Sequence, residues 1–162
     1  MPVRLSPRRL SEFTRFYAHE LECGKYPYVE FDSHERWHQR IYRDPRIDIW
    51  LISWLPTQGT EFHDHGGSSG AFTVLSGELS EAVPSATGVR DRRRVSGSSV
   101  SFGARYIHDV RNLGVEPAVS VHAYSPPLTS MTYYDLAVTG AVVPIRTLFT
   151  DDPEPAALAS AS

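Results

Sequence analysis

Turn-forming residues recur at short intervals from the middle of the chain onward, and this spacing limits what it can fold into. Gly, Asn and Pro separate short stretches that are rich in β-branched and aromatic residues. Stretches of this length and composition, bounded by turn signals, are typical of strands in an antiparallel sandwich or barrel. Strands are expected at 47–54, 71–75, 78–83, 88–94, 98–102, 105–111, 118–124, 131–137 and 141–149.

The first part of the chain has a helical period instead. Ser6 and Pro7 form a helix-start signal, because Ser caps a helix and Pro is tolerated in its first turn. Apolar residues then recur at a spacing of three to four until Gly24 ends the pattern. A second, short helix is expected from Ser33 toward Ile41.

No internal repeat or linker divides the chain, so we expect a single domain over 1–150. Within it, a helical N-terminal part at 1–42 precedes a β-barrel at 43–150. The remaining segment, 151–162, is a low-complexity run of acidic residues, Pro, Ala and Ser, and a flexible tail is expected there.

Composition excludes several classes of protein. The chain has 162 residues, a hydrophobic fraction of 41% and a net charge of −3, which indicate a globular protein and argue against a nucleic-acid partner. The basic run Arg90–Arg94 is interpreted as a solvated strand edge. No apolar run is long enough to span a membrane, and no secretory signal is visible. Cys23 is the single cysteine, so we expect no internal disulfide and a reducing, cytoplasmic location.

Histidines give the first chemical signal. His63 and His65 flank one aspartate, and in extended backbone residues i and i+2 point to one face, about 6.5–7 Å apart. His108 lies on a separate expected strand, so three imidazoles can converge on one metal ion. Taken alone, the His-x-His pair is equally compatible with an exposed polar loop.

A second group of polar residues alternates along one expected strand. Ser120, His122 and Tyr124 share one face, whereas Val121 and Ala123 take the other. Polar groups inside a barrel are costly unless they bond one another or serve a site. The pattern predicts a Ser–His–Tyr hydrogen-bonded relay, and the alternative is a buried network without a catalytic role.

These motifs give the chain a family resemblance. His-Asp-His, Gly77, the spacing of His108 and Asn112, and Ser-x-His-x-Tyr-Ser-Pro-Pro resemble the cupin superfamily and, within it, the cysteine dioxygenase type I family. The resemblance covers most of the chain, from about Trp37 to Tyr134. It implies a mainly β fold, a jelly-roll-like cupin barrel with short N-terminal helices packed outside it.

The resemblance also implies an activity and a set of site residues. The activity is Fe(II)-dependent conversion of L-cysteine and O2 to cysteine sulfinic acid by a protein that we expect to be a monomer. His63, His65 and His108 would hold the iron, while Ser120, His122 and Tyr124 would form the catalytic relay, with Tyr124 also contacting substrate. Trp54, Gly70 and Met131 are further pocket candidates.

Arg43 falls where Arg-type members of the family hold the substrate carboxylate. A guanidinium can grip a carboxylate through two parallel hydrogen bonds, which suits this role. Arg46 is the alternative candidate. Other readings of the whole site remain: a dioxygenase for another small thiol such as 3-mercaptopropionate, a zinc or nickel cupin, and a non-catalytic ligand-binding cupin.

One position departs from the family pattern. Gly70 stands where most cupins have an acidic ligand and where animal members of this family carry a Cys that forms a thioether with the relay tyrosine. Glycine has no side chain to contribute, so we expect three neutral histidine ligands and an unmodified Tyr124. The Ser-Pro-Pro sequence after that tyrosine further predicts a cis peptide bond at Ser125–Pro126.

Overall fold

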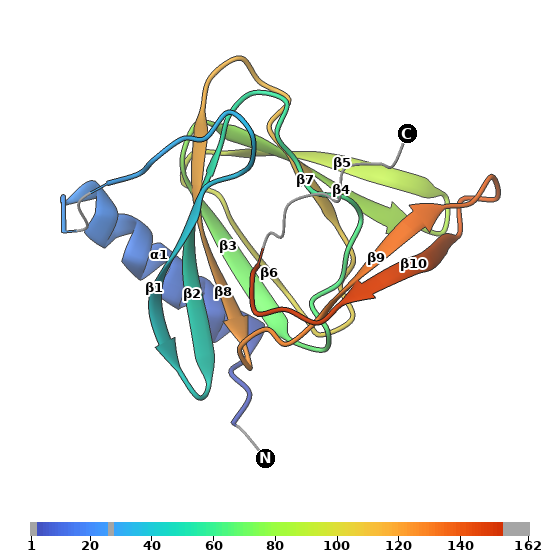
Figure 1. Ribbon diagram of the computed structural model, residues 1–162, viewed down its shortest axis with the longest axis horizontal. Coiled ribbons are helices and arrows are strands. Elements are labelled where there is room, and N and C mark those ends of the chain that lie inside the picture. Colours follow the sequence, from blue (N-terminus) through green and yellow to red (C-terminus); the bar gives the residue numbers. More distant parts are fainter. Residues whose placement is uncertain (1–2, 26–27, 154–162) are drawn as a thin grey trace.

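The computed structural model describes residues 3–25 and 28–153 of the chain. One helix precedes ten strands, and Figure 1 shows the helix against one face of a large sheet, with two smaller sheets on the opposite side. In chain order the elements are α1 (Pro7–Glu22), β1 (His38–Asp44), β2 (Ile47–Trp54), β3 (Ser69–Ser76), β4 (Glu78–Ser85), β5 (Gly88–Val95), β6 (Ser99–Phe102), β7 (Asp109–Arg111), β8 (Ala118–Ser125), β9 (Met131–Leu136) and β10 (Val142–Leu148).

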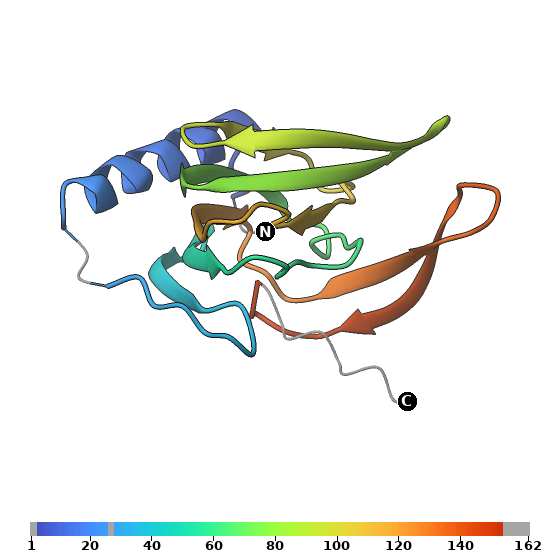
Figure 2. The same ribbon diagram turned by 90° about the horizontal axis from the view of Figure 1, so that it is seen from above.

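The strands form three antiparallel sheets. The large sheet has the order β1-β2-β8-β3-β6, and the smaller ones have the orders β5-β4-β7 and β10-β9. Figure 2 shows the β4–β5 and β9–β10 hairpins extending away from the side of the molecule that carries α1. Among the described residues, no helix combines the length and apolar character needed to cross a membrane.

A short irregular segment connects the two smaller sheets. Thr60 donates its backbone N–H to the Val110 carbonyl on β7 at 2.8 Å, and Asp64 donates to the Thr132 carbonyl on β9 at 2.9 Å. The segment therefore runs between β7 and β9 and completes a second wall opposite the large sheet. His63 lies in its middle and pairs with both His108 and Tyr133.

The centre of the large sheet is buried on both faces. Ile49 of β2 and Val121 of β8 pack with Leu10 of α1 in an outer core, whereas Trp54 and Phe72 belong to an inner core between the sheets. Because both faces of β2 are covered, all eight of its residues are buried, and most of them are apolar. Burial of the helix stripe against this sheet is what holds α1 in place.

The sequence predictions are confirmed for α1 and for most strands. α1 begins after Ser6, whose side chain accepts a hydrogen bond from the Arg9 N–H, and ends before Gly24, which has a φ of 76°. The Ser125–Pro126 peptide bond is cis, as expected. The expected tail at 151–162 is described only as far as Pro153.

Two expected elements are wrong. The helix predicted from Ser33 toward Ile41 is absent, and β1 begins at His38, so the helical part does not extend to residue 42. The segment instead forms a hairpin with β2 through a two-residue turn at Pro45 and Arg46. Sheet pairing overrides the weak helical pattern there. The strand predicted at 105–111 is shortened to β7, because residues before His108 form a turn.

The turn between β3 and β4 leaves no room for a side chain. Gly77 has a φ of 72°, and a Cβ atom there would lie 2.4 Å from the Pro117 carbonyl oxygen and 2.8 Å from the Ala118 Cα. Gly97 has a similar φ of 87° but nothing within 4 Å of such an atom. A substitution at Gly97 therefore introduces backbone strain alone, whereas one at Gly77 introduces backbone strain and steric overlap.

We predict that Gly77→Ala lowers the free energy of unfolding by about 2–5 kcal/mol, from roughly 1–2 kcal/mol of left-handed backbone strain and about 1–3 kcal/mol of overpacking. Gly97→Ala, the matched control, should lose only the first of these contributions. Urea unfolding of both variants measures the difference. Equal losses would show that the 117–118 backbone yields without cost.

Candidate metal centre and its surroundings

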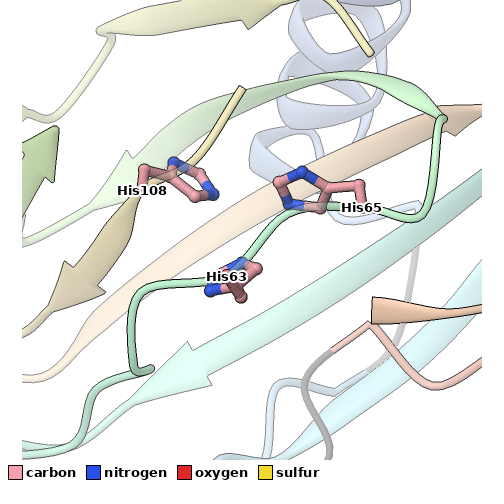
Figure 3. A group of neighbouring side chains, drawn as sticks. All are labelled: His63, His65 and His108. Atoms are coloured by element: carbon pink, nitrogen blue, oxygen red, sulfur yellow. The ribbon is translucent and has the colours of Figure 1, made fainter. Parts of the chain in front are cut away.

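Three histidine side chains meet between the large sheet and the opposite wall. One ring nitrogen from each of His63, His65 and His108 lies within 4.8 Å of the others, and all three residues are buried. Figure 3 shows the three rings turned toward a common space, two from the irregular segment before β3 and one from the residue before β7. The structure thus brings together the residues that the sequence predicted as a group.

The hydrogen bonds around the cluster leave metal-facing nitrogens available. His63 Nδ1 lies 2.7 Å from the Glu61 carbonyl oxygen and therefore carries its proton, while His63 Nε2 has no hydrogen-bond partner among the described residues. Both ring nitrogens of His65 likewise lack a partner there. Buried polar atoms without partners are rare in proteins unless a ligand satisfies them.

The protonation state of His63 and His65 also suits metal ligands. Burial lowers the pKa of His63 and of His65 well below the ordinary value, and the neighbouring histidines lower it further. Neutral imidazoles with unpaired nitrogens are the form that binds divalent transition metals. The residues present therefore fit a metal ion held by three histidines.

The polar relay predicted on β8 is present. Ser120 Oγ lies 2.7 Å from His122 Nε2, and Tyr124 Oη lies 3.3 Å from His122 Nδ1. Trp54 donates its indole N–H to Ser120 Oγ at 2.9 Å. The ring of Tyr124 stacks on that of His65, with centroids 5.2 Å apart, so one end of the relay touches the metal-site cluster.

His122 is neutral within this relay. Burial lowers its pKa to about 3, and electrostatic interactions with His108 and Arg36 act in the same direction. A neutral imidazole has one donor and one acceptor nitrogen, so its two neighbours receive opposite roles. The relay therefore fixes the orientation of the Tyr124 hydroxyl, which either donates to or accepts from the neutral ring of His122.

Gly70 lies directly opposite Tyr124 in the pairing of β3 with β8. A Cβ atom at this position would lie 2.4 Å from the ring of Phe102, and that ring stacks on His65 with centroids 4.8 Å apart. Phe102 therefore fills the space that a side chain at position 70 would need. Cys23 is exposed at the C-terminal end of α1, on the outside of the large sheet rather than between the sheets.

The remaining pocket candidates are both buried beside the site. Met131 at the start of β9 belongs to the inner core together with Tyr124 and Trp54. Trp54 is fully buried and acts through its hydrogen bond to the relay. The structure thus gives Trp54 a polar contact, whereas Met131 contributes apolar packing.

The arginines of β1 and its turn differ in what they contact. Arg46 pairs with Asp44 at 2.8 Å, and its side chain is exposed. Arg43 lines a surface pocket of about 660 Å³ together with Gly66 and Gly67, the residues that follow His65. The structure therefore places Arg43, and not Arg46, beside the histidine segment.

Sequence reasoning missed a second arginine on β1. Arg40 lies over the ring of Trp50 at 4.5 Å and donates to the buried Asp48 at 2.8 Å. Arg40 and Arg43 also both donate to Asp151, at 3.0 and 3.4 Å. The hydrogen bond from Arg40 holds the pKa of Asp151 below its ordinary value, so these two guanidinium groups already share one carboxylate.

Glu81 is another residue that the sequence did not single out. It is fully buried on β4 and lies 2.8 Å from His108 Nδ1. Burial alone would raise the pKa of its carboxyl group, but hydrogen bonds and charge from His108 and Arg94 lower it overall. Arg94 belongs to the basic run at 90–94, which otherwise forms the exposed strand β5.

Comparison with known proteins extends this description. The family model for cysteine dioxygenase type I matches residues 17–137. A cysteine dioxygenase type 1 from Danio rerio is 28% identical over 104 residues, and the match covers 56% of this chain and 50% of that protein. The human protein of the same name is 26% identical over 119 residues, covering 67% of this chain and 60% of the relative. The chain thus spans about half to three fifths of these relatives.

A solved structure supports the fold. A cupin protein from Desulfovibrio desulfuricans superposes with a TM-score of 0.54 at 18% identity, covering 63% of this chain and 92% of the other. The expectation of a mainly β cupin fold is therefore confirmed, with one N-terminal helix rather than two among residues 3–25 and 28–153. The hydrogen-bonded sheets remain separate and do not form one closed barrel.

The low pKa of His122 leads to a prediction about stability and pH. An unfolded histidine titrates near pH 6.5, so between about pH 6.5 and 3 the unfolded chain binds a proton that the folded chain does not. The free energy of unfolding of the metal-free protein should therefore fall as the pH drops through this window. The contribution of His122 should approach about 1.4 kcal/mol per pH unit.

His122→Gln should remove that share of the slope, as measured by urea unfolding between pH 4 and 7. His34→Gln, at an exposed position before β1, is the matched control and should leave the slope unchanged. A slope in His122→Gln equal to that of the unsubstituted protein would contradict the neutral, buried state of His122.

Proposed function

Since the chain belongs to the cysteine dioxygenase type I family, we propose that it is a metal-dependent thiol dioxygenase that acts on L-cysteine. The observation that carries this proposal is the cluster of three buried histidines whose ring nitrogens lie within 4.8 Å of one another. A cluster of this kind leaves open coordination positions for small ligands once a metal is bound.

The proposed metal is Fe(II), held by His63, His65 and His108. Three neutral ligands leave its double positive charge uncompensated in the first coordination sphere, which favours an anionic ligand such as a thiolate. When bound, the iron supplies the redox chemistry for O2 and keeps a coordinating thiol deprotonated. Imidazole also suits zinc and nickel, so metal analysis is part of the test.

The proposed reaction balances without an external reductant. Both atoms of O2 are joined to the sulfur of one thiol, which gives a sulfinic acid. The sulfur loses four electrons, and the same four electrons reduce O2. No further substrate is therefore required beyond a small thiol and O2.

The protein residues around the histidines position and shield the reactants. Tyr124 stacks on His65 and is hydrogen-bonded to His122, which supports a role for its hydroxyl beside the proposed metal position. His122 and Ser120 fix the orientation of that hydroxyl through their hydrogen bonds. Burial of Trp54 and Phe72 behind the relay excludes water from this side of the site.

Arg43 is the proposed partner of the substrate carboxylate, and Arg40 lies beside it. The support for this proposal is that both guanidinium groups already hold one carboxylate, that of Asp151. L-cysteine and 3-mercaptopropionate both carry a carboxylate, whereas cysteamine carries none. The arginine pair therefore favours the first two thiols over the third.

The first test is metal binding and oxygen uptake. The iron-loaded protein should bind one metal ion per chain and consume one O2 per cysteine oxidised to sulfinic acid, followed with an oxygen electrode and mass spectrometry. His108→Ala should abolish metal retention and turnover, because two histidines cannot complete the site. His19→Ala, on the exposed side of α1, is the control and should behave as the unsubstituted protein. Tight zinc binding without oxygen uptake would overturn the proposal.

A second test addresses substrate choice. Arg43→Ala should lower kcat/KM for cysteine by about 10- to 150-fold, which corresponds to the roughly 1.5–3 kcal/mol of a hydrogen bond to a charged group. Turnover of cysteamine, which lacks the carboxylate, should not change. Arg46→Ala is the matched control, since the hydrogen bonds of Arg46 to described residues all go to Asp44. An unchanged kcat/KM for cysteine in Arg43→Ala would shift the role to Arg40.

A further inference from the structure

One buried carboxylate lies directly behind the proposed metal site. Glu81 is fully buried on β4, and its Oε2 accepts hydrogen bonds from His108 Nδ1 at 2.8 Å and from the Tyr106 hydroxyl at 3.0 Å. Its Oε1 accepts from Arg94 Nε at 3.1 Å and from Arg94 Nη2 at 2.6 Å. These donors hold both oxygens of the Glu81 carboxylate in a fixed position.

The contact with Glu81 fixes which nitrogen of His108 carries the proton. An ionised carboxylate only accepts hydrogen bonds, so His108 Nδ1 must be the donor. The other nitrogen, Nε2, is then the metal-binding atom. The same hydrogen bond sets the rotation of the ring, because the carboxylate is held in place by Arg94 and Tyr106.

The three histidines differ in this respect. His63 donates to a neutral backbone carbonyl, and His65 has no partner for either nitrogen among the described residues. His108 alone within the cluster pairs with an anion. A carboxylate behind a ligating imidazole makes the imidazole a stronger electron donor to the metal.

Arg94 counteracts this carboxylate. Its side chain is 21% exposed, it reaches Glu81 from the neighbouring strand β5, and it carries a positive charge toward the metal site. The net charge near His108 is therefore set by the balance between one buried anion and one partly buried cation. Removal of the Glu81 charge makes the surroundings of His108 more positive, whereas removal of the Arg94 charge makes them more negative.

We propose that Glu81 is a positioning residue that raises the metal affinity of the three-histidine site through His108, and that Arg94 limits this effect. The proposal rests on the proposed metal site. It assigns a function to one arginine of the basic run at 90–94, and it places a negative charge in the surroundings of a site whose ligands are all neutral.

The test measures the affinity of the metal-free protein for Fe(II), under anaerobic conditions and in competition with a chromophoric chelator. Glu81→Gln keeps an oxygen that can accept from His108 but removes the charge, and it should weaken binding by about 10- to 100-fold. Arg94→Gln should strengthen binding, because it removes the opposing charge. Glu78→Gln, on the same strand and paired with exposed Arg93, is the matched control and should bind as the unsubstituted protein.

The Fe(III)/Fe(II) midpoint potential provides a second readout. Fe(III) carries more charge than Fe(II), so Glu81→Gln should raise the potential and Arg94→Gln should lower it. A purely structural role for the pair would instead weaken binding in both variants and would give no opposite signs. Circular dichroism of each metal-free variant verifies folding.

Each result decides the inference. Opposite shifts in the two variants support it, whereas an unchanged affinity in Glu81→Gln, or parallel losses in both variants, overturn it. Should Glu81→Gln fail to fold, Arg94→Gln decides alone, with stronger binding in favour and equal or weaker binding against. An unsubstituted protein that binds no metal would overturn the proposed function as well, and the two failures are therefore distinguishable.

Discussion

The burial of three imidazole rings side by side is the constraint on which the rest of the site depends. An imidazole loses hydration when it is buried, and the desolvation keeps His63 and His65 neutral. Neutral rings do not repel one another, so they can approach closely enough to share a ligand. The surrounding structure completes this arrangement, because His63 Nδ1 donates a hydrogen bond to a backbone carbonyl and His108 Nδ1 donates one to a carboxylate.

The position of these rings follows from how the two walls are joined. The segment that carries His63 is too irregular to be a strand, yet its backbone bonds to residues beside β7 and to β9. It therefore closes the wall opposite the large sheet and delivers its side chains inward. The relay on β8 approaches from the other wall, where alternation places Val121 and Ala123 against α1 and sends Ser120, His122 and Tyr124 inside.

Local patterns explain which features the sequence could predict. The helix start at Ser6–Pro7 and the alternation along β8 depend on neighbouring residues only, and both are observed. The failure at β1 has a tertiary cause, since residues 38–44 become a strand through pairing with β2. Glu81, Arg40 and Asp151 were missed for a related reason. Their contacts join segments that are distant in the sequence, as with Arg40 and Asp151, and no periodic pattern marks such pairs.

The contact of Asp151 with Arg40 and Arg43 has a consequence for any carboxylate that arrives from solution. Asp151 is tethered to the same chain, so it is present at a high effective concentration and acts as an intramolecular competitor. The observed affinity for an external anion is then the intrinsic affinity reduced by the fraction of time that Asp151 is displaced. Because Arg43 and Asp151 are both largely exposed, with relative exposures of 44% and 58%, their contact is weakly held. Such a competitor excludes weakly bound anions, while a ligand that gains binding energy elsewhere in the site can displace it.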